Sequence, residues 1–276
     1  MGIERLGLSD ADLDVLAAAM DTTVLQLRAD LDRRPWSILD HLEHPGVVQA
    51  ALEPEDPFRS NVSPFLFFAV LAQQAANDLR GSTYVNEWTG PRQRLPVFDV
   101  EPLREFAEAP GRVLFIAQLL AAFARPSALP VPANALDLED VAAWIEVSVP
   151  EDQVTLLRHL GDLALFRSGV LADETGPHAI DATLIERLLH PLRLSADELA
   201  SLHEHLADAA SVSPGIDAME SLGPTWYRAA SHADDRGRLS LTVTDIATRF
   251  RPARRFLNHL ADQYLNPGSV AVGLSI

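Results

Sequence analysis

The 276-residue sequence contains no cysteine and no lysine, so all 22 of its basic residues are arginine. Without cysteine, the chain can form no disulfide, no thiolate nucleophile and no cysteine-ligated zinc or iron–sulfur centre. Without lysine, lysine Schiff-base chemistry and the phosphate-binding P-loop are excluded as well. An arginine-only sequence that is rich in alanine and proline is typical of GC-rich coding, so it does not by itself indicate anion binding.

Positive charge is also scarce, because 39 acidic residues leave a formal net charge of −17. Such a charge repels nucleic-acid phosphate and anionic lipid unless a local basic patch overrides it, so we expect neither as a partner. The longest apolar runs, residues 64–72 and 113–124, are shorter than the roughly 20 residues that span a bilayer. The opening sequence MGIERLGLSDADLD carries no apolar export signal. The sequence therefore predicts a cytoplasmic protein.

Hydrophobic residues recur at helical spacing through most of the chain, and they make up 47% of it. Helix start signals accompany them; for example, Ser63 followed by Pro64 is a typical N-cap and first-turn pair. We therefore predict an all-α fold, a compact array of about ten helices in which about two-thirds of the residues are helical. In the second half, the predicted helices cover residues 138–147, 151–166, 182–190, 196–210, 216–230 and 244–265.

Residues 81–99 break the helical pattern. Residues 83–85 have strand character, Gly90-Pro91 is a turn signal, and residues 95–98 can pair back on the first strand. The sequence therefore predicts one small β-hairpin-like insertion.

A Pro/Ala-rich stretch, residues 126–136, resembles a linker. It divides the chain into a predicted N-terminal helical lobe, residues 1–125, which carries the insertion, and a C-terminal helical lobe, residues 137–276. A single domain is the alternative.

No motif that dictates a chemistry is intact. The sequence lacks G-x-G-x-x-G, G-x-S-x-G and H-E-x-x-H. Asp10, Asp12 and Asp14 imitate the start of a calcium loop, but Val15 replaces its glycine and Asp21 stands where the bidentate glutamate belongs. We therefore expect no metal and no cofactor.

Two stretches resemble a helix-turn-helix in spacing, each over roughly twenty residues. In the first, Ala17 lies in the second helix of the motif and Asp21 in the turn. Thr23 caps the recognition helix, which has Leu27 and Leu31 at its buried positions. A plain helical hairpin produces the same spacing. Residues 1–35 carry seven acidic residues against four arginines, which opposes entry into a DNA groove.

The second stretch, residues 247–257, repeats this spacing and adds a local basic cluster. In a DNA-binding regulator the cluster would contact phosphate, and it would equally suit a carboxylate, a phosphate ligand or an acidic partner protein. Alternatively, Pro252 begins or kinks one continuous helix whose arginines face water. The candidate anion or nucleic-acid patch consists of Arg249, Arg251, Arg254 and Arg255.

The irregular segment 77–99 is the candidate ligand site. Irregular backbone held by a helical scaffold often carries binding groups, and arginines beside aromatic rings suit an anionic or planar ligand. In a purely structural interpretation, Arg80 and Arg94 pair with Asp78 and Asp99, and Trp88 covers a hydrophobic edge. The candidate ligand-binding residues are Asp78, Arg80, Tyr84, Trp88, Arg92 and Arg94.

A few ionisable residues interrupt apolar helices and are candidates for acid–base chemistry. Arg158 and Asp162, four residues apart in one predicted helix, can also pair with each other as structural groups. An enzyme of unrecognised type would use Asp78, His159 or His259.

The leading hypothesis is a non-catalytic helical protein that binds a partner protein or a small anionic or planar ligand. The alternatives are a helix-turn-helix regulator and an enzyme that uses aspartate and histidine groups.

Overall fold

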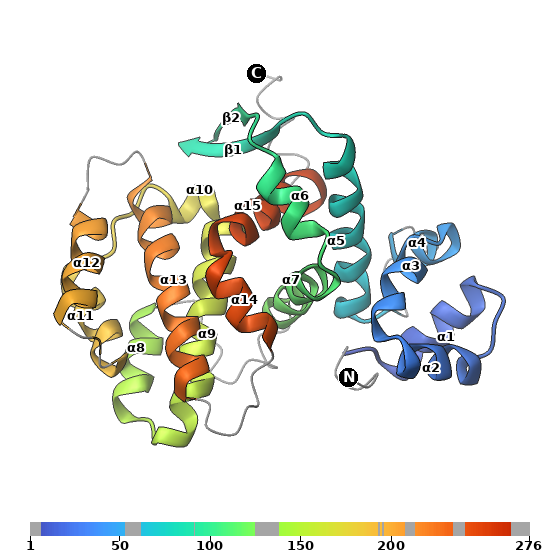
Figure 1. The fold of residues 1–276 in the computed structure, drawn as a ribbon, viewed down its shortest axis with the longest axis horizontal. Coiled ribbons are helices and arrows are strands. Elements are labelled where there is room, and N and C mark those ends of the chain that lie inside the picture. The colour runs from blue at the N-terminus through green and yellow to red at the C-terminus, as the bar shows by residue number, and fades with distance from the viewer. Residues whose placement is uncertain are drawn as a thin grey trace. The chain divides into compact units, whose positions relative to one another are not determined.

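The computed structural model describes residues 7–52, 62–90, 92–124, 138–192, 194, 196–207, 213–233 and 241–265. Helices make up 79% of these residues, with fifteen α-helices and one two-stranded antiparallel sheet among them (Figure 1). The predicted all-α fold with one small hairpin is therefore confirmed. The predicted linker, residues 126–136, lies outside the described residues.

The chain divides into two compact units, of which the first comprises Met1–Thr83 and Glu101–Ala124. In this unit α5 packs against both α4 and α7, and its buried residues join those of α7 in one hydrophobic core. The helices of the first unit are α1 (Asp10–Ala19), α2 (Val24–Arg33), α3 (Ile38–Leu42), α4 (Pro45–Leu52), α5 (Pro64–Gly81), α6 (Glu101–Ala107) and α7 (Pro110–Phe123).

One buried carboxylate ties the start of α1 to the start of α5. The side chain of Ser63 caps α5, as predicted, by accepting a hydrogen bond from the Leu66 backbone N–H. Asp12 accepts the backbone N–H of Ser9 at 2.7 Å and that of Ser63 at 2.7 Å, through different oxygens. Asp12 thus satisfies the backbone N–H group of the N-cap residue at both helix starts.

Among the described helices, none is by itself long and apolar enough to cross a membrane. Helices α6 and α7 are together long and apolar enough, but they meet at a bend of 86°.

The second unit comprises Tyr84–Val100 and Arg125–Ile276. Its long helices α9 and α13 lie side by side, and α15 packs against both (Figure 1). The elements of this unit are β1 (Val85–Gly90), β2 (Gln93–Val97), α8 (Leu138–Val147), α9 (Pro150–Gly169), α10 (Ala172–Thr175), α11 (Ala182–Leu189), α12 (Ala196–Ala207), α13 (Pro214–Ala233), α14 (Leu241–Thr248), α15 (Phe250–Leu260) and the π-helical segment η6 (Ala261–Leu265).

Glycine allows the close packing of these helices. A Cβ atom on Gly161 of α9 would lie 2.5 Å from the ring of Tyr227 in α13, and one on Gly223 would lie 2.3 Å from the ring of Phe250. Both distances are shorter than any real carbon–carbon contact, so a side chain at either glycine would separate the helices.

The prediction of a single helix over residues 244–265 is wrong, because α14 ends at Thr248 and α15 begins at Phe250. Arg249 lies at the break with φ −118° and ψ 32°. The proline nitrogen of residue 252 has no hydrogen to donate to the carbonyl of Thr248, which is the last residue of α14. In the first turn of α15 the same proline is tolerated, since N–H groups there have no partner within the helix.

The hairpin also differs from the predicted organisation. We expected it to belong to the N-terminal lobe, but it groups with the second unit, and β1 packs against α10 and α15. The side chains that attach the hairpin come from α10, α15 and η6, far away in the sequence.

Candidate functional site

One carboxylate, that of Asp173 in α10, attaches the hairpin to the second unit. Its Oδ1 accepts the Trp88 indole N–H and the Arg92 backbone N–H, both at 2.8 Å. The two oxygens also accept guanidinium N–H groups of Arg94 at 3.2 and 3.1 Å. Arg92 occupies the hairpin turn with φ 56°. A single side chain therefore fixes the turn and one residue from each strand.

Arg94 lies between two carboxylates, because its Nε also donates to Asp262 of η6 at 3.0 Å. Burial opposes the charged form of this guanidinium, but the hydrogen bonds to Asp173 and Asp262 raise the pKa of Arg94. Burial likewise opposes the charged form of Asp173, and the bonds from Arg94, Arg92 and Trp88 still lower the pKa of that carboxyl. Both groups are thus held in their charged forms.

The Trp88 ring covers a glycine. It is buried, at 6% exposure, in a small cluster with Ala172 and Ile216. A Cβ atom on Gly176 would lie only 2.2 Å from this ring. The hairpin is therefore attached by apolar packing as well as by charge.

A second attachment joins β1 to α15 through buried arginines. Glu87 of β1 forms an ion pair with the Nε of Arg255. Its other carboxylate oxygen lies 3.8 Å from a guanidinium nitrogen of Arg254. Arg255 also donates to the backbone carbonyl of Asp99 at 2.9 Å. Each of the two arginine side chains is only 6% exposed.

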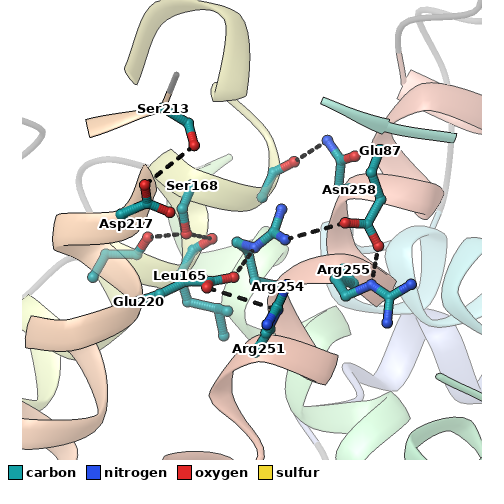
Figure 2. Close-up of polar contacts among 12 residues, drawn as sticks. Glu87, Leu165, Ser168, Ser213, Asp217, Glu220, Arg251, Arg254, Arg255 and Asn258 are labelled. Atoms are coloured by element: carbon teal, nitrogen blue, oxygen red, sulfur yellow. Dashed lines mark hydrogen bonds and ion pairs between the residues drawn. The ribbon is translucent and has the colours of Figure 1, made fainter. Parts of the chain in front are cut away.

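Arg254 also reaches α13 on its other side, as does the nearby Arg251. Arg254 Nε lies 2.5 Å from Glu220 Oε1, and Arg251 Nε lies 3.9 Å from Glu220 Oε2. Figure 2 shows Arg254 between the carboxylates of Glu87 and Glu220.

Glu220 also lines a half-open pocket of about 940 Å³, which we call the α12–α13 pocket. This volume lies within the range typical of sites for small molecules. The lining combines apolar, hydroxyl and charged side chains from α13, from α12 and from the residues before α12. The lining residues are Leu192, Leu194, Asp197, Glu198, Leu202, Glu220, Ser221, Pro224, Thr225, Arg228, Ala229 and His232.

A proline interrupts the helical hydrogen bonding of α13 beside this pocket. Pro224 has no N–H, so the carbonyl of Glu220, four residues earlier, receives no helical hydrogen bond from it. The neighbouring carbonyl of Ser221 accepts the hydroxyl of Thr225 at 3.2 Å. A backbone acceptor without its helical donor therefore belongs to a residue of the pocket wall.

A separate polar pair lies between α9 and α13. Tyr227 donates its hydroxyl to Asp162 at 2.7 Å, and Arg158 lies 3.6 Å from the other oxygen of that carboxylate. Burial raises the pKa of Asp162 despite the opposing effects of Arg158 and Tyr227. Burial and the adjacent carboxylate raise the pKa of Tyr227 well above its usual value. The predicted helical pairing of Arg158 with Asp162 is present.

This environment predicts a pH effect that an Asp162→Asn variant isolates. A carboxyl whose pKa is raised by folding binds its proton more tightly in the folded state, so acidification through the folded-state pKa stabilises the protein. The free energy of unfolding of the wild type minus that of Asp162→Asn should therefore rise as the pH falls from about 7 to about 4. Urea denaturation at stepped pH measures it, with the exposed Asp152→Asn as control. A difference that falls with acidification would contradict the assignment.

The structure does not bring the six predicted ligand-binding residues together in one site. Asp78 and Arg80 are exposed at the end of α5 in the first unit, whereas the other four belong to the hairpin of the second. Trp88 is buried and Arg94 is bound by two carboxylates, while Arg92 is exposed. Tyr84, half exposed, lies near Phe98, with ring centroids 6.0 Å apart and the ring planes tilted by 53°.

The arginine cluster is split in the same way. Arg254 and Arg255 are buried, so these two side chains do not face water, whereas Arg249 pairs with Asp245 at 3.6 Å and Arg251 is 72% exposed. The four arginines therefore do not share one exposed surface. The first helix-turn-helix-like stretch is a tight α1–α2 pair with Thr23 as the cap, and Asp21 takes φ 51° in the turn.

The candidate acid–base residues do not line the α12–α13 pocket. His159 and His259 are buried in α9 and α15, at 2% and 7% exposure, and Asp78 lies in the first unit. Among the described residues, no three histidine or acidic side chains are arranged to hold a metal ion.

Sequence reasoning connected none of the four carboxylates that organise this region with the arginine that it binds. Glu87, Asp173, Glu220 and Asp262 come from four different elements, and no local spacing connects them to the arginines. The available signal was the presence of the adjacent Arg254 and Arg255 directly before the apolar Phe256 and Leu257, because charges that are buried with apolar neighbours require partners. That signal indicates a need for carboxylates but not which residues supply them.

Comparison of the chain with models of protein families, with curated proteins and with solved structures gave no match.

Proposed function

We propose that this protein is a binding protein rather than an enzyme, and that it holds a small cationic amphipathic molecule in the α12–α13 pocket. The observation that carries the proposal is the pocket itself, a hollow of about 940 Å³ with leucine side chains beside charged ones. Ligand sites typically combine an apolar lining with a few polar groups that orient the ligand.

The charge of the lining favours a cation. Among the lining residues that the structure describes, Asp197, Glu198 and Glu220 supply three carboxylates, whereas Arg228 is the one arginine. Arg228 lies 3.4 Å from the hydroxyl of Thr225. A positively charged ligand group would also be attracted by the chain's net charge of −17.

An anionic ligand at the hairpin has less support. Arg94 and Arg255 are already bound by carboxylates and backbone carbonyls, so an anion would have to displace those partners. Removing one partner from a buried ion pair is costly.

The test compares three probes that share one phenylbutyl group: 4-phenylbutylammonium, 4-phenylbutanol and 5-phenylpentanoate. We expect the ammonium to bind with a Kd of about 1 mM or tighter, as a good ligand of this size can. It should bind about tenfold more tightly than the alcohol, since a hydrogen bond to a charged group contributes about 1.5 kcal/mol or more. Ligand-observed NMR titration measures all three.

The matched variants locate the site. Asp197→Asn with Glu198→Gln removes two charges from the lining and should weaken ammonium binding about tenfold. Glu174→Gln with Glu186→Gln removes two exposed charges of the same unit that do not line the pocket, and should leave binding unchanged. Equal binding of the three probes, or equal effects of the two double variants, would refute the proposal.

A further inference from the structure

The α12–α13 pocket and the hairpin share one arginine. Glu220 lines the pocket and binds Arg254 at 2.5 Å, and Arg254 also forms an ion pair with Glu87 of β1 at 3.8 Å. Figure 2 shows this chain of contacts running from α13 through α15 to the strand. Two carboxylates from different elements therefore share one guanidinium, through different nitrogen atoms.

Because all three groups are largely buried, a change of charge at one carboxylate affects the other. The Arg254 side chain is 6% exposed, and those of Glu220 and Glu87 are 19% and 15% exposed, so water screens the charges weakly. A buried guanidinium must keep a carboxylate partner. If the charge of Glu220 is neutralised, Arg254 depends on Glu87, and the pair that attaches the hairpin becomes stronger.

From this arrangement we infer that a cation bound in the α12–α13 pocket tightens the attachment of the hairpin to the second unit, with Arg254 as the shared group. The inference rests on the proposed function, since it concerns the regulation of the same pocket. The coupling is reciprocal: whatever the ligand adds to the Glu87–Arg254 pair, that pair adds to ligand affinity.

The surface that would respond is exposed and partly apolar. Leu95 of β2 is 58% exposed, and Phe98 just after β2 is 72% exposed. Binding in the pocket would therefore steady a surface that belongs to a different element from the pocket wall.

The first arm of the test needs no ligand. Glu220→Gln removes the charge that a bound cation would neutralise, and amide hydrogen exchange of residues 85–97 reports the attachment of the hairpin. Relative to exchange in the rest of the unit, we expect exchange in β1 and β2 to slow by about fivefold, the lower end of typical coupling between sites. Exchange that is unchanged or faster in these strands, relative to the rest of the unit, would overturn the inference even if no ligand binds.

The second arm measures the reciprocal effect on the probe. Glu87→Gln lies outside the pocket lining and should raise the Kd of 4-phenylbutylammonium about fivefold. Asp99→Asn is the matched control, because Asp99 is 70% exposed and lies near Arg255 rather than Arg254. It should leave the Kd unchanged. If Glu87→Gln binds the probe as tightly as the wild type does, the coupling is refuted and the proposed function stands. If the wild type does not bind the probe, the proposed function is refuted, and the hydrogen-exchange arm still tests the coupling.

Discussion

Replacing Glu87 with alanine is expected to lower the free energy of unfolding by about 3 kcal/mol, because the change leaves buried arginine charge without its carboxylate. Arg254 keeps Glu220, and Arg255 keeps the carbonyl of Asp99, so the loss falls at the lower end of values for broken buried ion pairs. Urea denaturation followed by circular dichroism measures the change.

Two further variants separate uncompensated charge from simple loss of contacts. Glu101→Ala removes a glutamate whose side chain is 80% exposed and pairs with Arg104 on the surface, and should cost less than about 1 kcal/mol. Adding Arg255→Met to Glu87→Ala should recover about 1 kcal/mol, because the second change removes the unpaired charge. If the second substitution instead adds to the loss, the charge explanation fails.

Local features of this fold were readable from the sequence because local physics determines them. Ser63 and Pro64 start α5 through a side-chain cap and a preset backbone angle, and both effects act within one turn. Helix α8 has the predicted bounds of residues 138–147, and the hairpin pairs Val85 with Val97 as its strand character and turn signal indicated.

The attachments of the hairpin were not readable because they join residues far apart along the chain. Glu87 and Arg255 are separated by 168 residues, as are Arg94 and Asp262. A carboxylate close in sequence, such as Asp78, appeared an equally good partner for an arginine of the segment. Helical spacing placed Arg254 and Arg255 in the right region, but the depth at which they lie depends on which element packs above α15.

The break between α14 and α15 shows the same limit in another form. The buried positions Ile246, Phe250, Ala253 and Leu257 continue one helical spacing across it. Periodicity alone therefore favours a single helix. The effect of Pro252 appears four residues earlier, at the carbonyl that it cannot bind, so the helix ends before the proline rather than at it.

Replacing Gly215 with alanine is expected to be at least as damaging as the loss of Glu87. A Cβ atom at this position would lie 1.9 Å from the carbonyl oxygen of Thr175 and 2.5 Å from that of His178. Both are backbone atoms, so no side-chain rotation relieves the clash, and the start of α13 must move away from α10. Overpacking of this kind costs about 3 kcal/mol, and more when the backbone cannot adjust.

The position of Gly215 gives this change a second measurable effect. Its N–H donates to the carbonyl of Gly176 at 3.2 Å, and Gly176 lies beneath the Trp88 ring. A displaced α10 also carries Asp173, which holds both strands of the hairpin. We therefore expect Gly215→Ala to destabilise the protein by about 3 kcal/mol and to accelerate amide exchange in β1 and β2 beyond the rest of the unit.

Gly81→Ala is the matched control, because no atom lies within 4 Å of a Cβ atom built at that helical glycine. Alanine there should be neutral or stabilising by up to about 1 kcal/mol, as expected for a helix position without steric conflict. Equal stability of Gly215→Ala and Gly81→Ala would show that α10 and α13 do not approach as closely as the structure places them. Since α10 carries Asp173, the same result would also remove the geometric basis for the attachment of the hairpin.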